Sequence, residues 1–448
     1  MRGTLRLILL AAASPIVLGL LATTPASAAS KERILYSFRS GADGAYPGTS
    51  LVFDAAGNLY GTTPAGGYGC GVNGCGIAFK LTPGADGKWT ETVLHSLCAR
   101  CSDWLKPSSL AFDSAGNLYG VFTYGGSQVC NADGAPCGQV FELMPSKSGP
   151  WSEKILVGFG GKFGWGPSGG LISDSAGDLY GATLFGGHGV CDELDDGCGT
   201  VFELSPQEDG RWALKFLYGF DGEDGGNPVA SLVFDRAGNL YGSSQEGGAA
   251  GCGLWGCGAV FQLTPRAHGR WKLTNLHHFG GGNNGSVPNG GLIFDSAGNL
   301  YGTTQAGGRG NCEDDGSIGC GTVFELIPGA DGKWTYKVLH EFENNGKDGY
   351  FPNGGLVLDN AGNLYGTTIV GGPGGRSCSD YDGCGMVFEL TPGTNGKWTE
   401  RIVHSFKNDG KDGISPRAGL VMDQAGNLYG TTSNGGEAGY GTVFEITP

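Results

Sequence analysis

The chain has 448 residues, of which 89 are glycine and 39% are hydrophobic, and its formal net charge is −15. The glycines follow no Gly-X-Y period, which excludes collagen, and aromatic and aliphatic positions that recur regularly exclude intrinsic disorder. The acidic balance argues against nucleic acid and anionic membranes as partners, because phosphate groups repel it, and favours cations, basic partners or neutral sugars.

Residues 1–28 have the pattern of a secretory signal peptide. Arg2 and Arg6 give a positive start, an apolar stretch follows, and Ala-Ser-Ala at the end is a small-residue cleavage site. An uncleaved membrane anchor is the alternative, and Pro15 argues against it. No later segment approaches the ~20 apolar residues of a spanning helix. The sequence therefore predicts a soluble mature chain, residues 29–448, that is secreted or periplasmic and has a formal charge of −17.

One pentapeptide, Gly-Asn-Leu-Tyr-Gly, recurs seven times, with Asp178 replacing Asn in the third copy. The copies lie at residues 57–61, 116–120, 177–181, 238–242, 298–302, 362–366 and 426–430. Spacings of 59 to 64 residues mark a repeat protein, in which neighbouring units build the core together. We therefore expect residues 29–448 to form a single domain despite their length.

Each unit contains four strand-like segments, which the fifth unit shows most clearly. They are Gly291–Asp295, Asn299–Thr304, Gly321–Ile327 and Trp334–Phe342. All are short, rich in β-branched or aromatic residues, and bounded by Gly, Pro, Asn and Asp. No sustained helical periodicity is present. Seven units of four antiparallel strands predict an all-β fold, a seven-bladed β-propeller.

The two ends of the mature chain predict how this ring closes. Residues 34–38 (ILYSF) match the fourth segment of the other units, whereas residues 441–446 (GTVFEI) form a third segment with no fourth after it. The N-terminal strand should therefore complete the last blade and remove an exposed edge.

The loops from second to third strand and from fourth to first strand share one face of such a ring. Nearly all length variation and all cysteines lie in these loops, so we expect this variable face to make contacts. An even number of cysteines in an exported chain favours disulfides over zinc, because zinc-binding pairs need partners of matching spacing and no repeated histidine lies beside these cysteines. The expected pairs are Cys70/Cys75, Cys98/Cys101, Cys130/Cys137, Cys191/Cys198, Cys252/Cys257, Cys312/Cys320 and Cys378/Cys384.

Several loops on the variable face are acidic. The acids are Asp192, Glu193, Asp195 and Asp196 in unit three, Glu313, Asp314 and Asp315 in unit five, and Asp380 and Asp382 in unit six. Carboxylates in such clusters could bind Ca²⁺, but no segment has the full spacing of a calcium loop. A solvated acidic rim is the preferred interpretation, and no cofactor is expected.

Some aromatic residues of the variable face break the repeat. Trp104 and Trp165 lie in fourth-to-first loops, Trp255 lies inside a disulfide loop, and Tyr381 lies in the loop of unit six. Aromatic residues outside the pattern suit stacking against sugar rings or a protein partner, although packing within the loops explains them equally well. The tryptophans that obey the repeat, such as Trp89, Trp271 and Trp334, should pack between blades.

Catalytic motifs are weak in this sequence. Residues 166–170 match G-x-S-x-G, but they occupy a slot filled by Pro-Asn-Gly-Gly in other units, without a following helix. Five of the seven histidines fall in the fourth segment and are expected to be structural: His95, His277, His278, His340 and His404. A hydrolase with paired carboxylates from different blades stays open, because sequence does not place their separation.

The repeat GLVFD-x-AGNLYGTT followed by GTVFELTP and GKWT resembles the Gloeo/Verruco (GloVer) tandem repeat of exported bacterial proteins, over residues 31–448. The resemblance implies export and carries no biochemical activity. Family members often end in anchoring signals, whereas this chain ends at Pro448 without an apolar tail, so release or periplasmic residence is expected. The leading hypothesis is a monomeric, non-catalytic propeller that binds an extracellular glycan or protein. The alternative is a carbohydrate-active hydrolase or lyase that uses loop carboxylates.

Overall fold

The computed structural model describes residues 30–448 except for short stretches in the loops. These stretches are 69–73, 98–105, 127, 131–135, 148, 161–162, 188, 190, 192–195, 249–251, 253–255, 315–316, 374–377 and 379–382. The predicted signal peptide lies outside the described residues. No helix in the described part of the chain is long and apolar enough to cross a membrane.

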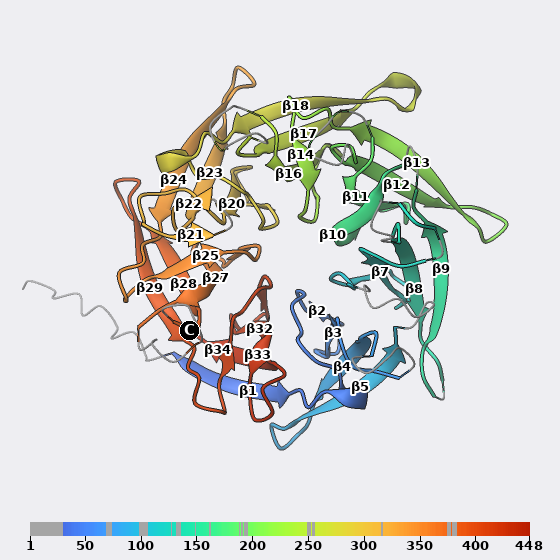
Figure 1. Cartoon of the computed structure of the whole chain (residues 1–448), viewed down its shortest axis with the longest axis vertical. Coiled ribbons are helices and arrows are strands. Elements are labelled where there is room, and N and C mark those ends of the chain that lie inside the picture. Colours follow the sequence, from blue (N-terminus) through green and yellow to red (C-terminus); the bar gives the residue numbers. More distant parts are fainter. Residues whose placement is uncertain are drawn as a thin grey trace, which may run out of the picture.

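Seven antiparallel sheets stand around a central axis and form a seven-bladed β-propeller (Figure 1), which confirms the predicted fold. Blade one contains β2 (Val52–Phe53), β3 (Leu59–Thr63), β4 (Ile77–Pro83) and β5 (Trp89–Ser96). Blade two contains β6 (Ala111–Phe112), β7 (Leu118–Phe122), β8 (Gln139–Met144) and β9 (Ser152–Gly158). Blade three contains β10 (Trp165–Ser173), β11 (Leu179–Phe185), β12 (Thr200–Pro206) and β13 (Trp212–Gly219).

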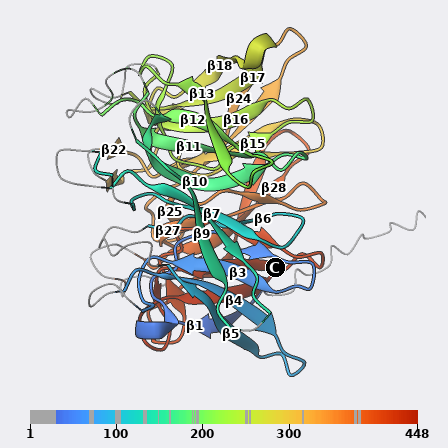
Figure 2. The same ribbon diagram turned by 90° about the vertical axis from the view of Figure 1, so that its right-hand side faces the viewer.

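The next two blades carry small additions. Blade four contains β15 (Val233–Phe234), β16 (Leu240–Glu246), β17 (Ala259–Pro265) and β18 (Trp271–His278), with β14 (Gly226–Pro228) also paired to β16. Blade five contains β19 (Ile293–Phe294), β20 (Leu300–Thr304), β23 (Thr322–Pro328) and β24 (Trp334–Glu341). Its second-to-third loop forms a separate pair, β21 (Glu313–Asp314) and β22 (Ser317–Ile318), which projects from one face of the ring (Figure 2).

The last two blades complete the ring. Blade six contains β26 (Val357–Leu358), β27 (Leu364–Gly371), β28 (Met386–Pro392) and β29 (Trp398–Ser405), with β25 (Gly349–Pro352) paired to β27. Blade seven contains β31 (Val421–Met422), β32 (Leu428–Thr432), β34 (Thr442–Thr447) and β1 (Lys31–Ser37), and β30 (Gly413–Ile414) pairs with β33 (Asn434–Gly435) beside it. Helical structure among the described residues is of the 3-10 type and includes η1 (Gly41–Asp43), η3 (Ala267–Gly269) and η4 (Gly282–Asn284).

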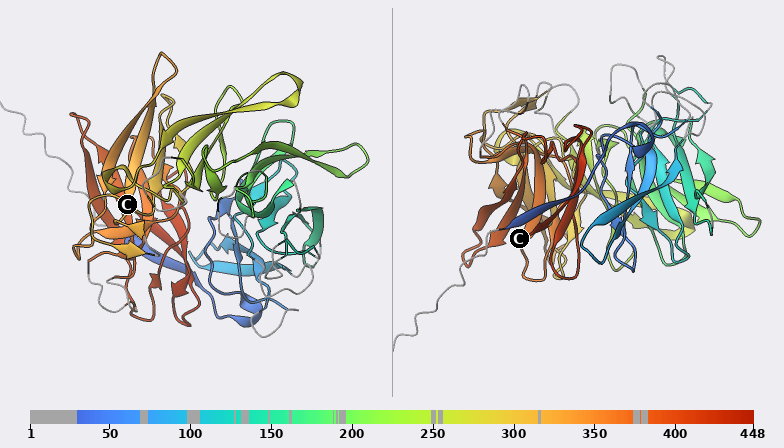
Figure 3. Two further views of the ribbon diagram at one scale, coloured as in Figure 1. Left: turned by 45° about the horizontal axis from the view of Figure 1, so that its top comes forward. Right: turned by 90° about the horizontal axis from the view of Figure 1, so that it is seen from below.

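The N-terminal strand closes the ring as predicted. β1 pairs antiparallel with β34, with Ile34 opposite Phe444 and Ser37 opposite Thr442. The amide of Phe38 then donates to the carbonyl of Gly441 (3.0 Å). Seen edge-on, β1 crosses the outside of the last blade (Figure 3, right). The pairing joins the two ends of the described chain and covers the edge of β34.

The repeated Leu-Tyr-Gly sequence is explained by packing inside each blade. In blade six Leu364 is fully buried, and the ring of Phe388 lies over Gly366, where a Cβ atom would be 2.5 Å from the ring. The hydroxyl of Tyr365 donates to Asp359, which also accepts the backbone amide and the side-chain amide of Asn363. The Asp-x-Ala-Gly-Asn turn is thus an Asx-type turn tied to the second strand.

The hydrophobic core is divided into seven clusters in the described residues, one at each junction between adjacent blades. The tryptophan that begins the fourth strand packs against the tyrosine of the preceding blade, as Trp89 does with Tyr429 (centroids 6.2 Å apart) and Trp334 with Tyr241 (6.0 Å). The predicted packing role of these tryptophans is confirmed. Since each cluster needs two blades, no single repeat has a core of its own.

Candidate functional site

Trp165 is the one predicted aromatic contact that the structure describes, and it opens β10. Its ring stacks on Phe185, with centroids 4.2 Å apart and an interplanar angle of 23°, and the residue is only 6% exposed. Trp165 therefore packs within the cluster between blades two and three. Trp104, Trp255 and Tyr381 lie outside the described residues, and their role as ligand contacts stays a prediction.

Five of the predicted disulfides are present among the described residues. They are Cys130–Cys137, Cys191–Cys198, Cys252–Cys257, Cys312–Cys320 and Cys378–Cys384. Cys75 is also disulfide-bonded, whereas Cys70, Cys98 and Cys101 lie outside the described residues. Bonds of this kind are typical of oxidising compartments and are consistent with a secreted or periplasmic protein.

The second cysteine of each of these disulfides also joins two blades. At five junctions its carbonyl accepts the amide of a residue in the next blade, at 2.9–3.1 Å, as Cys320 does from Phe351. Phe351 has a φ of 59°, a left-handed conformation that costs a bulky residue ~1–2 kcal/mol. At the closure of the ring Tyr440 replaces the cysteine and accepts from Tyr46 (2.8 Å). The disulfide loops therefore brace the ring itself, in addition to any contact they make outside.

Most of the acidic loop residues lie outside the part of the chain that the structure describes. These are Asp192, Glu193, Asp195, Asp315, Asp380 and Asp382. Calcium binding by the loops therefore stays untested. The side chains of Glu313 and Asp314, on β21, are likewise outside the described set.

A cavity of about 260 Å³ lies on the axis of the ring and is lined by the segments that precede the seven inner strands. Each blade contributes to the lining the residue that stands three positions before the buried leucine at the beginning of its inner segment. In blade order these residues are Gly48, Pro107, Ser168, Val229, Asn289, Asn353 and Arg417. The repeat is uniform in backbone but not in chemistry, because the large polar side chains are confined to blades five to seven.

Asn289 and Asn353 line this cavity and connect to Gln245 and Gln305, and we refer to these four side chains as the amide cluster. Asn289 accepts from the Gln245 amide and donates to Gln305 and to Asn353, the last at 3.0 Å. Asn353 in turn donates to the carbonyl of Arg417 (2.9 Å). The cluster links blades four, five, six and seven, and the exposed Arg417 is the single charged residue among the described residues that line the cavity.

The G-x-S-x-G match also lies on this cavity. The hydroxyl of Ser168 donates to the carbonyl of Pro228 in the next blade (2.7 Å). The described lining contains no imidazole and no carboxylate. No base within the described lining can therefore activate Ser168.

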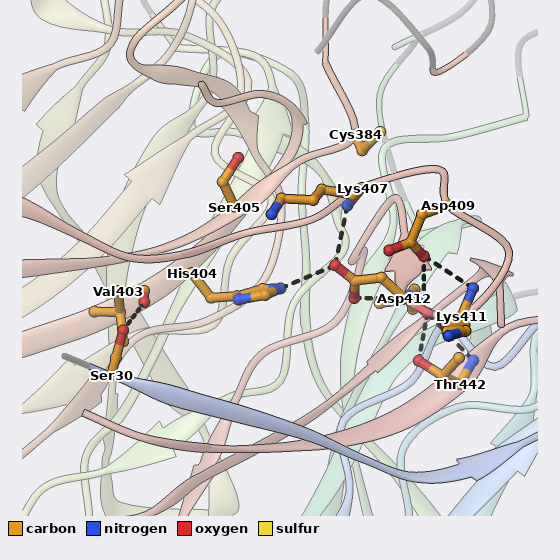
Figure 4. Close-up of polar contacts among 12 residues, drawn as sticks. Ser30, Cys384, Val403, His404, Ser405, Lys407, Asp409, Lys411, Asp412 and Thr442 are labelled. Carbon is orange, nitrogen blue, oxygen red and sulfur yellow. Dashed lines mark hydrogen bonds and ion pairs between the residues drawn. The ribbon is translucent and has the colours of Figure 1, made fainter. Parts of the chain in front are cut away.

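Histidine and carboxylate side chains do converge, but at blade junctions on the outer strands, far from the motif that suggested catalysis. We call His340–Asp348–Glu400 and His404–Asp412–Glu32 the junction triads. One ligand atom from each residue lies within 4.8 Å of the other two in both triads. His340 Nε2 is 3.3 Å from Asp348 and 3.9 Å from Glu400. His404 Nε2 is 3.1 Å from Asp412 (Figure 4).

The same junction holds different residues elsewhere in the ring. Between blades seven and one, the hydroxyl of Tyr36 donates to Asp43, and Glu91 occupies the place of Glu400. Between blades four and five, His277 stacks on Tyr336 with centroids 3.7 Å apart and accepts or donates a hydrogen bond at Asn284 (3.0 Å). Glu32, Glu91 and Glu400 thus each lie near a loop aspartate, whereas the loop aspartate between blades three and four, Asp224, accepts from Tyr218.

Electrostatics at these junctions is dominated by burial. Burial, reinforced by the charge of Asp412, raises the pKa of Glu32 to about 7. Burial also raises the pKa of Glu400 to about 7, although His340 opposes the shift. Burial alone would lower the pKa of His340, but its hydrogen bond to Asp348 and the charge of Glu400 raise it. Each triad therefore concentrates negative charge that requires a proton or a cation.

Comparison with known proteins supports the assignment of the repeat. The model of the Gloeobacter/Verrucomicrobia repeat matches residues 106–312 and 309–448. The chain belongs to this repeat family. The matches begin just before blade two and run through β34, so the GloVer repeat accounts for the bladed architecture. Among curated protein sequences, none matches the chain significantly.

Solved structures share the propeller fold at low sequence identity. Virginiamycin B lyase from Staphylococcus aureus has a TM-score of 0.51 at 13% identity, over 94% of this chain and 99% of that chain. The polysaccharide lyase Uly1 has a TM-score of 0.50 at 12% identity, over 92% of both chains. PorZ, a surface component of the type-IX secretion system of Porphyromonas gingivalis, has a TM-score of 0.50 at 12% identity, over 92% of this chain and 47% of its own. At these identities the similarity establishes the fold alone.

Sequence reasoning did not predict the amide cluster or the junction triads. Asn289 and Asn353 were visible as Pro-Asn-Gly-Gly, but their partner Gln245 lies on β16 and Gln305 directly follows β20. The triads were hidden because their histidines obey the repeat. A comparison of the second residue after the tryptophan of each fourth segment would have shown Glu400 but not Glu32, because Ser30 stands where the other units have tryptophan.

Proposed function

We propose that this protein is an exported, non-catalytic propeller that binds a glycan at the mouth of its central cavity. The observation that supports the proposal is the chemical asymmetry of the lining. Glycine, proline and valine occupy the equivalent position in other blades, so the fold does not require asparagine or arginine there. Amides and a guanidinium on one side of a cavity, with hydroxyls around the rest, suit a ligand rich in hydroxyl groups.

The amide cluster is suited to orient such a ligand. Its side chains hold one another through the bonds centred on Asn289, which limits their rotation before the ligand arrives and reduces the entropy cost of binding. Arg417 lies beside the cluster and can pair with a carboxylate on an acidic sugar. Trp104, Trp255 and Tyr381 stay predicted ligand contacts, because aromatic rings stack well on sugars.

An enzyme is the second candidate, since two propellers with the same fold are named as lyases. Proton transfer on a sugar needs an acid or base within hydrogen-bond reach. The described lining supplies amides, hydroxyls and a guanidinium, which favours binding over turnover. Carboxylates from the acidic loops are the groups that would support catalysis.

The test uses the purified mature chain on a glycan array, followed by calorimetry with each glycan that binds. Replacing both asparagines (Asn289→Ala with Asn353→Ala) should weaken binding at least ten-fold, whereas Val229→Ala, at the same position in blade four, should leave the affinity unchanged. Equal loss in both variants, or none in the double variant, would place the ligand elsewhere. Release of reducing sugar or of an unsaturated product from the same glycans would establish the lyase or hydrolase instead.

A further inference from the structure

The junction triads lie apart from the proposed glycan site, and none of their residues lines the central cavity. Each combines one imidazole nitrogen with oxygens of two carboxylates, from three separate segments of chain: an outer strand, the loop after it, and the outer strand of the next blade. His340 lies on β24 and Glu400 on β29, while His404 lies on β29 and Glu32 on β1. The arrangement therefore repeats at two successive junctions.

The glutamate of each triad has a buried oxygen without a hydrogen bond, although Oε1 of Glu400 lies 3.9 Å from Nε2 of His340. Oε1 of Glu32 and Oε1 of Glu400 are both buried and without a hydrogen bond. No lysine or arginine side chain forms an ion pair with either triad among the described residues. A buried carboxylate oxygen that faces another carboxylate without a donor is costly unless a proton or a cation neutralises the charge.

The aspartates are already held in the position of ligands. Asp348 accepts the amide of Glu343 (3.0 Å) at Oδ2 and the amide of Gly349 (2.7 Å) at Oδ1. Asp412 makes the corresponding bonds with Lys407 and Gly413, and Figure 4 shows His404 and the Lys407 amide meeting at its carboxylate. Backbone donors of this kind orient metal-binding carboxylates in known sites.

We propose that each junction triad binds one divalent transition-metal ion of the Zn²⁺ class through the histidine Nε2 atom and one oxygen from each carboxylate. Zinc takes such ligands at ~2.0–2.2 Å in a tetrahedron, which sets ligand–ligand separations of roughly 3.3–3.5 Å and leaves a fourth position for water. The separations of 3.1, 3.3 and 3.9 Å at His404 and His340 require small side-chain adjustments to reach this geometry.

Metal binding at the second triad has a consequence for the closure of the ring. Glu32 belongs to β1, so the ion would fasten the N-terminal strand to β29 of blade six across a junction. Ser30 already donates to the carbonyl of Val403 at the same place (Figure 4). An ion that binds only the closed ring stabilises it by mass action.

The test measures zinc in tag-free mature protein that has been stripped with a chelator. Titration with Zn²⁺ in a calorimeter should show two sites per chain, and His340→Asn and His404→Asn should each remove one. Glu91→Gln changes the glutamate of the junction between blades seven and one, where Tyr36 replaces the histidine, and should leave both sites intact. Thermal melting should rise with zinc in the wild-type protein and lose part of that rise in each histidine variant.

Circular dichroism establishes that each variant is folded before its zinc is counted. Absence of zinc binding to the stripped wild-type protein would overturn the proposal, and would indicate that a proton on histidine provides the positive charge. Unchanged stoichiometry in the variant that carries both substitutions would also overturn it, because the metal would then bind elsewhere, for example at the acidic loops.

Discussion

The closure of the ring by β1 can be tested with one substitution and a matched control. Phe38 follows β1, is fully buried, and meets Phe79 of blade one edge-on with centroids 5.2 Å apart. Phe342 is its equivalent after β24, also fully buried, and meets Phe388 at 5.2 Å. The two amides donate to the equivalent glycine carbonyls at the same distance, 3.0 Å. Truncating a buried phenylalanine to alanine costs about 3–5 kcal/mol through lost burial and the cavity left behind.

Because the two sites match, Phe38→Ala and Phe342→Ala should lower the free energy of unfolding by the same amount, to within about 1 kcal/mol, in the range typical for such truncations. Urea unfolding followed by circular dichroism measures the loss, and limited proteolysis under native conditions reports whether β1 separates first. A small loss for Phe38→Ala, under about 1 kcal/mol, beside a full loss for Phe342→Ala would show that the seam contributes little in solution. The argument for a sealed ring would then be refuted.

Two further predictions concern the repeat and its electrostatics. Gly366→Ala places a Cβ atom 2.5 Å from a phenylalanine ring and should destabilise the protein by roughly 1–3 kcal/mol in thermal unfolding, whereas Gly158→Ala, in open space, should not; equal effects would contradict the packing argument. Burial and a neighbouring aspartate raise the pKa of Glu91 to about 7, so the folded state binds its proton more tightly than the unfolded chain and stability falls as pH rises through that value. Glu91→Gln should therefore gain about 1 kcal/mol on the wild-type protein between pH 5 and pH 8, after allowance for solvent screening, and a difference that does not change with pH would contradict this.

The fold was predictable because the information for it is local and repeated. The second strand of unit five was expected at Asn299–Thr304 and lies at Leu300–Thr304. The first was expected at Gly291–Asp295, but its ladder contains only Ile293–Phe294. The inner strand shortens because segments from neighbouring blades crowd near the axis, where a Cβ atom on Gly290 would lie 2.7 Å from the carbonyl oxygen of Gly354. Strand propensity cannot detect that crowding.

The candidate sites were less predictable, because a residue's agreement with the repeat does not show which side chains surround it in the fold. Trp165 departs from the repeat and was therefore proposed as a ligand contact, whereas in the structure its ring stacks on Phe185. His340 and His404 obeyed the repeat and were predicted to be structural, yet each lies beside two carboxylates. Departure from a repeat identifies residues free of one constraint, and does not reveal which neighbours they meet.

By itself, the sequence determined the number of blades, the order of strands within them and the strand that closes the ring, because turn chemistry and alternation act between residues close in the chain. The tertiary structure alone decided which side chains share a site. Asn289 and Asn353 are 64 residues apart and Glu32 and His404 are separated by most of the chain, and only the curvature of the closed ring brings each pair together.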